Sequence, residues 1–169
     1  MARTSSTRAG RSASIGADGN RFKFDELVAA DAQLLGRVTY DGFARAWPSM
    51  TDDEGFADRM NSMPKYVVST TIGTPSWNNS TVIAENVAEE VRAVKDRYAG
   101  DLLVAGSGQL VRSMMQAQLV DELRLMVFPI VLGSGARLFA EGTPVTTLEL
   151  VESRPVGPDG VTLVTYAPV

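Results

Sequence analysis

Residues 101–109, with the sequence DLLVAGSGQ, constrain the fold of this chain more than any other segment. Residues 102–105 are a short apolar run, and Gly106, Ser107 and Gly108 then lead into a helix predicted over residues 107–116. Glycines let the backbone turn tightly and approach a ligand, and the first N–H groups of a helix favour an anion. The segment therefore predicts a strand, a turn and a helix. The turn is either a phosphate cradle or a plain connection.

Two other elements of the sequence have a similar position after an apolar run. Gly36 and Arg37 follow the run at residues 33–35, and a helix is predicted after them. Hydroxyl side chains close the run at residues 66–69, and these are Ser69, Thr70 and Thr71. Ligands of open α/β sheets bind beyond the carboxyl ends of the strands, so the three elements predict one common site.

Strand and helix patterns alternate through the middle of the chain, and two antiparallel strands end it. This order predicts an α/β fold with a mostly parallel sheet, helices on both faces and an antiparallel edge at the C-terminus. Thr39 and Asn86 are predicted helix caps, the latter in a capping box with Glu89. Predicted helices include residues 52–63, 86–98 and 107–116, and predicted strands cover residues 33–35, 66–69, 80–83, 102–105, 123–132, 148–156 and 161–166.

Composition excludes several classes of chemistry. The chain of 169 residues has no cysteine and no histidine, which excludes the usual zinc sites, a thiol nucleophile and a Ser-His-Asp relay. An organic cofactor can still supply the chemistry. The net charge of −4 argues against nucleic acid or an anionic membrane as partner. The lack of cysteine suits the cytoplasm.

The first 20 residues differ in composition from the rest of the chain. Residues 1–20 are rich in Ser, Arg, Ala and Gly, with Ile15 as the only large apolar residue after Met1. Such a segment cannot bury enough apolar surface to fold alone, which predicts a flexible N-terminal segment. Residues 21–169 are then the folded domain.

Four motifs together resemble a known family: LLGRVTY, YVVSTT, LLVAGSGQLVRSMMQAQLVDELRL and FPIVLGSGARLF. They are similar to the dihydrofolate-reductase-like superfamily, in the branch of the C-terminal reductase domain of riboflavin biosynthesis (the RibD C-terminal type) and its stand-alone relatives. The resemblance runs from Phe22 to the C-terminus. It implies a three-layer sandwich, a homodimer, and a reductase that uses NADPH to reduce a small pterin-, pyrimidine- or quinone-like heterocycle.

The resemblance also implies a cofactor site. In the family, the Gly-Arg-x-Thr element meets the nucleotide phosphates, hydroxyl residues after the next strand lie near the 2′-phosphate of the ribose, and the glycine turn holds the pyrophosphate. The residues of this chain at those places are Gly36, Arg37, Thr39, Ser69, Thr70, Thr71, Gly106, Ser107, Gly108, Gln109 and Leu110. A guanidinium and several hydroxyl donors suit a ribose phosphate.

The chain departs from the family pattern at three places. Family members begin with an apolar strand that ends in Ser-Leu-Asp-Gly and borders the substrate, but residues 14–19 read SIGADG after a polar segment. The pyrimidine reductases of riboflavin biosynthesis have an Asp-Asp-Pro stretch where residues 42–48 stand, and a glutamate where Ala105 stands. These departures favour another heterocycle over 5-amino-6-(5-phosphoribosylamino)uracil as the substrate.

Other readings of the sequence stay open. A nucleotide-binding dimer that has lost catalysis with its first strand is one alternative, and a scaffold that binds no nucleotide is another. The sequence identifies no proton donor. Asp25, Glu26 and Asp31 lie in or near the helix that carries the acid of dihydrofolate reductases, and water can supply the proton in this superfamily.

Overall fold

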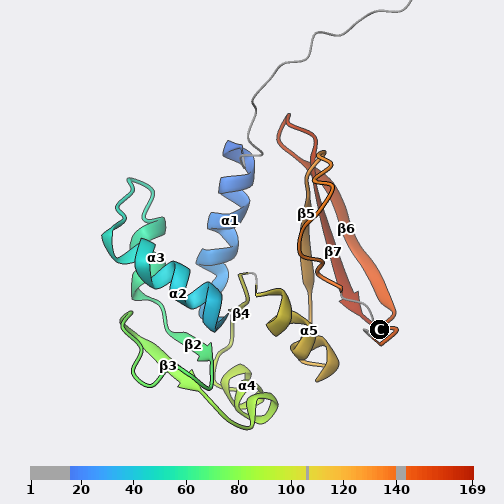
Figure 1. The fold of residues 1–169 in the computed structure, drawn as a ribbon. Helices are drawn as coiled ribbons and strands as arrows, with labels where there is room; N and C mark the ends of the chain where they lie inside the picture. Colours follow the sequence, from blue (N-terminus) through green and yellow to red (C-terminus); the bar gives the residue numbers. More distant parts are fainter. Residues whose placement is uncertain (1–15, 106, 140–143) are drawn as a thin grey trace, which may run out of the picture.

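The computed structural model of this protein describes residues 16–105, 107–139 and 144–169. Its strands form two sheets that stand side by side (Figure 1). The first is parallel and four-stranded, in the order β3-β2-β1-β4. Its strands are β1 (Ala30–Gly36), β2 (Lys65–Val68), β3 (Ser80–Ile83) and β4 (Asp101–Leu103). The second is antiparallel, in the order β5-β7-β6, from β5 (Leu123–Val127), β6 (Leu148–Val156) and β7 (Val161–Pro168).

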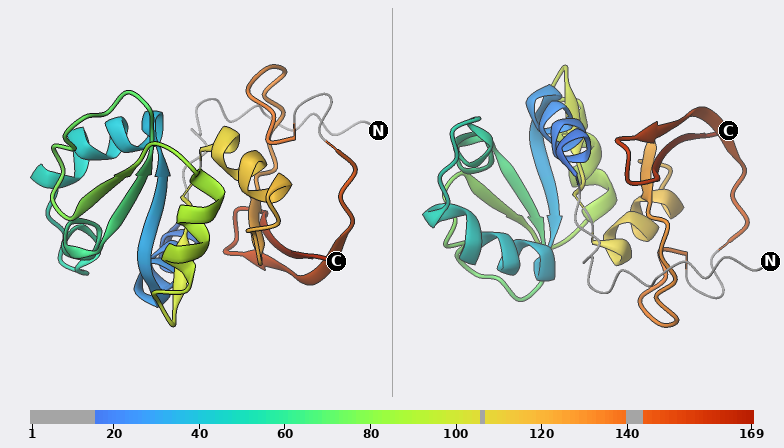
Figure 2. Two further views of the ribbon diagram at one scale, coloured as in Figure 1. Left: turned by 90° about the horizontal axis from the view of Figure 1, so that it is seen from below. Right: turned by 90° about the horizontal axis from the view of Figure 1, so that it is seen from above.

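Helices cover both faces of the parallel sheet (Figure 2). On one face, Leu34 and Tyr66 pack against α4 (Val87–Lys95) and α5 (Gly108–Gln116). On the other, Leu35 and Val67 pack against α1 (Ala17–Ala29), α2 (Arg37–Ala46) and α3 (Phe56–Ser62). A short 3₁₀ turn, Trp47–Ser49, follows α2. Side chains alternate between the faces of a strand, so neighbouring residues of β1 and β2 enter different cores.

The structure confirms the predicted fold class and corrects two of its details. The antiparallel strands form a sheet of their own, whereas the sequence predicted an edge of the parallel sheet. Helix α1 begins at Ala17, so the folded part starts within the predicted flexible segment of residues 1–20. Residues 1–15 lie outside the described part of the chain. No helix among the described residues is long and apolar enough to cross a membrane.

Several predicted boundaries are wrong for local reasons. The predicted strand at residues 123–132 ends at Val127, and the one at residues 102–105 ends at Leu103. The helix predicted over residues 52–63 begins only at Phe56, because Asp52 accepts hydrogen bonds from the N–H groups of Phe56 and Ala57. These bonds, with that of Ala57 the largest cause, hold the pKa of Asp52 below its usual value.

Both predicted side-chain caps are wrong. Thr39 lies inside α2, which begins at Arg37 after Gly36, and its hydroxyl pairs with Ser107 instead. Asn86 does precede α4, but with a φ of 48° and without a side-chain hydrogen bond to the helix. Its carbonyl oxygen accepts from the N–H of Glu89, so the helix starts without the predicted capping box.

Candidate functional site

The candidate site begins where β1 passes close to the turn before α5. The N–H of Gly36 donates to Ser107 Oγ at 3.1 Å, and Thr39 Oγ1 lies 2.7 Å from the same oxygen. A Cβ atom at Gly36 would lie 2.5 Å from Ser107 Oγ, so only glycine fits this approach. Ser107 itself has a φ of 60°, a left-handed conformation that is uncommon for a residue with a side chain. The three residues therefore hold a tight junction between two helix starts.

Two helices start at this junction. Helix α2 has Gly36 as its N-cap residue, and α5 has Ser107. The first intrahelical bond of α5 runs from the Val111 N–H to the Ser107 carbonyl, which leaves earlier N–H groups of the helix without an intrahelical partner. Both helix dipoles add positive potential at the junction. The geometry suits an anion such as the pyrophosphate of a dinucleotide.

The surface of α5 stays open at its first residue. A Cβ atom at Gly108 would meet only Arg112 Nη1 at 3.6 Å and Leu138 Cδ1 at 4.0 Å, which are ordinary contacts. The chain itself does not need glycine there. A ligand bound at the start of α5 would require glycine at position 108, because any side chain there would occupy the space of the ligand.

A cation lies beside the junction. Arg37, the first residue of α2, is half exposed, and its guanidinium is 3.1 Å from the carboxylate of Asp41 one turn later. An exposed pair of this kind contributes little stability, so the guanidinium can exchange Asp41 for a phosphate at small cost. This arrangement agrees with the predicted phosphate contact of Arg37, which stays a prediction.

The hydroxyl cluster lies beside the junction, at the end of β2. Val68 of β2 pairs with Gly36 of β1, so Ser69 follows at the same edge of the sheet. Ser69 is buried, and its Oγ accepts from the N–H groups of Thr71 and Ile72 at 3.1 Å each. Ser69 therefore shapes the turn. Thr70 and Thr71 are exposed and remain the candidates for a ligand contact.

The predicted site residues thus share one edge of the parallel sheet but have different surroundings. Gln109 is exposed, whereas the side chain of Leu110 is buried in the core, so only its backbone faces a ligand. Gly106 lies outside the described residues. Binding by any of these residues stays a prediction. Among the described residues, no group of three or more Asp or Glu side chains could hold a metal ion.

A cavity of about 810 Å³ lies between β4 and β5. Its lining extends from Ala105, which follows β4, to Asp101 and Arg124 near the starts of β4 and β5, at the end of the parallel sheet opposite the junction. Of the three acids that the sequence offered as proton donors, only Glu26 lines it. Glu26 is 7% exposed. Asp25 pairs instead with Arg21 at the surface, and Asp31 accepts from the N–H of Gly100. Of these three acids, Glu26 is therefore the one that a molecule in the cavity would meet, beside Asp101, Asp121 and Glu122, which also line it.

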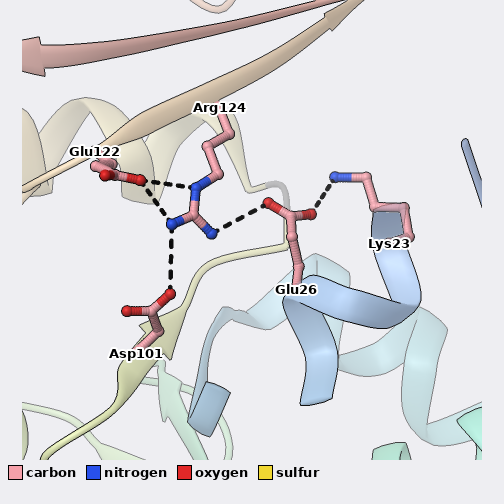
Figure 3. A network of polar contacts seen from close by, with 5 residues as sticks. All are labelled: Lys23, Glu26, Asp101, Glu122 and Arg124. Carbon is pink, nitrogen blue, oxygen red and sulfur yellow. Dashed lines mark hydrogen bonds and ion pairs between the residues drawn. The ribbon is translucent and has the colours of Figure 1, made fainter. Parts of the chain in front are cut away.

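Glu26 belongs to a network that ties α1 to both sheets (Figure 3). Lys23 Nζ lies 2.8 Å from one carboxylate oxygen of Glu26, and Arg124 Nη1 lies 3.7 Å from the other. Arg124 also contacts Glu122 at 2.6 Å and Asp101 at 3.5 Å. Burial lowers the pKa of Arg124, but the hydrogen bond and charge of Glu122 and the charges of the other two acids outweigh it and raise the pKa.

Sequence analysis missed Arg124 and Asp101 as members of this site. The only available indication was a charged residue within the apolar strand sequence LRLMV. Such a residue predicts a partner but does not identify it. Glu122 is a neighbour in the sequence, but Glu26 and Asp101 come from α1 and β4, far away along the chain, and only the fold brings them to Arg124.

Comparisons with known proteins agree on one family. The family model of the RibD C-terminal domain matches residues 4–162. The chain is 30% identical to Uncharacterized protein YyaP of Bacillus subtilis (strain 168), over 84% of this chain and 76% of that protein. It is 27% identical to Uncharacterized protein YwjB of the same organism, over 83% and 76% of the two chains.

Solved structures share the fold at low sequence identity. A Shewanella sp. PV-4 protein assigned provisionally to riboflavin biosynthesis has a TM-score of 0.69 at 21% identity, with 86% of this chain and 77% of that chain covered. Acinetobacter baumannii RibD has a TM-score of 0.64 at 14% identity, over 95% of this chain but only 53% of its own. The match over nearly the whole sequence shows that this chain belongs to the RibD C-terminal domain family.

Proposed function

We propose that this protein is an NADPH-dependent reductase of a small pterin-, pyrimidine- or quinone-like heterocycle, acting in the cytoplasm. The family is one of oxidoreductases related to riboflavin biosynthesis. The observation that carries the proposal is the junction of Gly36 and Ser107, where two helix starts meet and a Cβ atom would not fit. When bound, NADPH would supply the hydride.

The proposed contacts with the cofactor and with the heterocycle lie at two different places in the structure. The N–H groups at the starts of α2 and α5 hold the pyrophosphate, and Arg37 with Thr70 and Thr71 holds the phosphate on the ribose. The heterocycle occupies the cavity between β4 and β5, where Glu26 accepts hydrogen bonds from its N–H groups. Apolar side chains of both helix layers, such as Phe43 and Met114, line that cavity beside the charged residues.

The test of this function is NADPH oxidation by the purified full chain with a panel of pterins, aminouracils and quinones. We expect turnover with one chemical class. The panel includes 5-amino-6-(5-phosphoribosylamino)uracil, since a Thermotoga maritima protein with a TM-score of 0.58 and 16% identity is a reductase of that compound by its name. NADPH binding without turnover of any compound would instead support the second candidate, a nucleotide-binding dimer without catalysis. The open gap between the two sheets favours that candidate.

The proposed assembly is a homodimer. The antiparallel sheet exposes large apolar side chains, among them Val127, Leu150 and Val151, each more than half exposed. Such a surface on a water-soluble domain is typical of an interface. Light scattering of the purified protein is expected to give twice the 18.1 kDa mass of one chain.

Replacing Arg37 by alanine is expected to weaken NADPH binding by about 1–3 kcal/mol, the scale of a charged hydrogen bond, and to leave NADH binding nearly unchanged. The reason is that only NADPH carries the 2′-phosphate. Titrations of both nucleotides measure this, with Arg45→Ala, an exposed arginine in the last turn of the same helix, as the control. Equal losses for NADPH and NADH would contradict the role of Arg37.

Replacing Glu26 by glutamine is expected to lower kcat about 100-fold with the best substrate of the panel, the scale of a lost hydrogen bond to a charged acceptor, while NADPH affinity stays unchanged. The matched control is Asp25→Asn, because Asp25 is exposed on the same helix and paired with Arg21. If Glu26→Gln lowers the melting temperature but keeps kcat, Glu26 serves only to tie α1 to Arg124.

A further inference from the structure

Residues 128–139 follow β5 as a long loop beside α5 (Figure 2). At its start, Pro129 packs on the turn between β6 and β7, because a Cβ atom at Gly160 would lie 3.4 Å from Pro129 Cγ. In its middle, Gly133 and Gly135 have φ angles of 74° and 154°, which favour glycine, and a Cβ atom at either would meet nothing within 4 Å. The loop is therefore anchored to the antiparallel sheet at its start and lies in open space at its centre.

The far part of this loop is anchored to α5 by Arg112. The Nη1 atom of Arg112 donates to the carbonyl oxygens of Leu138 at 3.0 Å and of Arg137 at 3.3 Å. Side chains of a helix lean toward its N-terminus, and Nη1 lies 3.6 Å from the place of a Cβ atom on Gly108, one turn earlier. Leu138 Cδ1 lies 4.0 Å from the same place. Residues 137 and 138 therefore cross the first turn of α5.

Helix stability alone does not account for a cation at this position. Arg112 is half-buried, and both hydrogen bonds that it makes with described residues go to backbone carbonyls, not to a carboxylate. Its guanidinium lies near the positive end of the dipole of α5, where a cation is unfavourable. What the side chain does achieve is to fix the loop next to Gly108, the place proposed for the pyrophosphate.

We propose that Arg112 is a positioning residue of the nucleotide site, which holds residues 137 and 138 as a wall beside the first turn of α5. This role rests on the proposed binding of the pyrophosphate at Gly108. The guanidinium of Arg112 and the side chain of Leu138 then border the phosphates on the side of the antiparallel sheet. The nucleotide site is thus built from the parallel sheet together with the loop that follows β5.

Trypsin digestion of the wild-type chain tests the wall, because Arg112 holds the carbonyl of the Arg137–Leu138 bond that trypsin would cut. Cleavage of a folded protein reports how often the segment opens. We expect saturating NADPH to slow this cleavage at least tenfold, measured by mass spectrometry of the fragment 138–169. Cleavage after Arg21, which is exposed on α1, is the reference. No protection by bound NADPH, or equal protection of both bonds, would overturn the proposal.

Replacing Arg112 by glutamine is expected to speed cleavage of the Arg137–Leu138 bond at least tenfold without ligand, because both hydrogen bonds to the loop are lost. The matched control is Arg92→Gln, since Arg92 Nη2 donates to the carbonyl oxygen of Ala117 after the other end of α5, at 3.3 Å. This control should cleave like the wild type. Arg112→Lys keeps a charged donor and is expected to restore part of the protection. An unchanged rate in Arg112→Gln would show that Arg112 does not hold the loop.

Titration of the same variants separates positioning from a purely structural role. Arg112→Gln is expected to weaken NADPH and NADH about tenfold each, by the same factor, because both nucleotides carry the pyrophosphate. Faster cleavage with wild-type affinity for both nucleotides would mean that the loop is no part of the site, and would overturn the proposal. A wild-type chain that binds neither nucleotide would instead refute the proposed function on which this role rests.

Discussion

Gly108→Val is expected to lower NADPH affinity by at least 100-fold, while the melting temperature without ligand falls only slightly. The valine side chain would occupy the surface on the first turn of α5, where the pyrophosphate is proposed to lie. Within the protein it has room, because a Cβ atom at this position meets Arg112 at 3.6 Å and Leu138 at 4.0 Å. Valine also has a higher intrinsic helix propensity than glycine, so propensity does not lower the stability of α5. Calorimetric titration and thermal unfolding measure the two effects separately.

The control for this prediction is Gly36→Ala. Its Cβ atom would lie 2.5 Å from Ser107 Oγ, so the junction must open whether or not a nucleotide is bound. We expect the free energy of unfolding of this variant to fall by about 1–3 kcal/mol, the usual cost of overpacking, together with NADPH affinity. If Gly108→Val lowers the free energy of unfolding as much as Gly36→Ala does, or binds NADPH like the wild type, the turn before α5 is only a connection.

The stability of the protein is expected to rise with pH through the titration of Lys65. This side chain is fully buried, and burial lowers its pKa from 10.5 to about 8. Between these two values the unfolded chain binds the proton more tightly than the folded chain, so deprotonation favours the folded state. Relative to Lys65→Met, the wild type should gain about 2 kcal/mol of unfolding free energy between pH 7.5 and pH 10.

Urea unfolding of both proteins across this pH range measures the difference, in which the other titrating groups cancel. Lys95→Met is the matched control, because Lys95 is partly exposed and pairs with Asp121 at the surface. A flat difference for Lys65 would mean that its pKa is not lowered. In that case the carbonyl oxygens of Asn61, Met63 and Asn78 and the ring of Trp77 at 4.2 Å compensate the burial of the charge.

Sequence patterns correctly predicted those strands that a few neighbouring residues determine. The strands at residues 80–83 and 148–156 have the predicted bounds, because apolar alternation and turn residues mark both ends. Thr39 was predicted as a cap from its residue type, and Asn86 from its residue type and the capping-box spacing to Glu89. In the structure, the hydroxyl of Thr39 forms a hydrogen bond with that of Ser107, 68 residues away, and Asn86 has a left-handed backbone conformation. Long-range contacts of this kind override local preference.

The candidate site, too, could be predicted from the sequence only in part. The glycine turns and the hydroxyl run could be placed at one sheet edge from sequence, because each follows a parallel strand. The contact of Gly36 with Ser107 and the network around Arg124 could not, since each joins residues from different elements. The sequence also did not predict that the strands form two separate sheets, because strand order depends on pairing between distant segments.

We expect this chain to bind NADPH at the starts of α2 and α5, and an equilibrium titration of the purified full chain with NADPH and with NADH measures this binding. NADPH is expected to bind saturably at one site per chain, and NADH at least tenfold more weakly, because Arg37 and the hydroxyls after β2 would contact the 2′-phosphate that NADH lacks. Absence of NADPH binding, or equal affinity for both nucleotides, would contradict it.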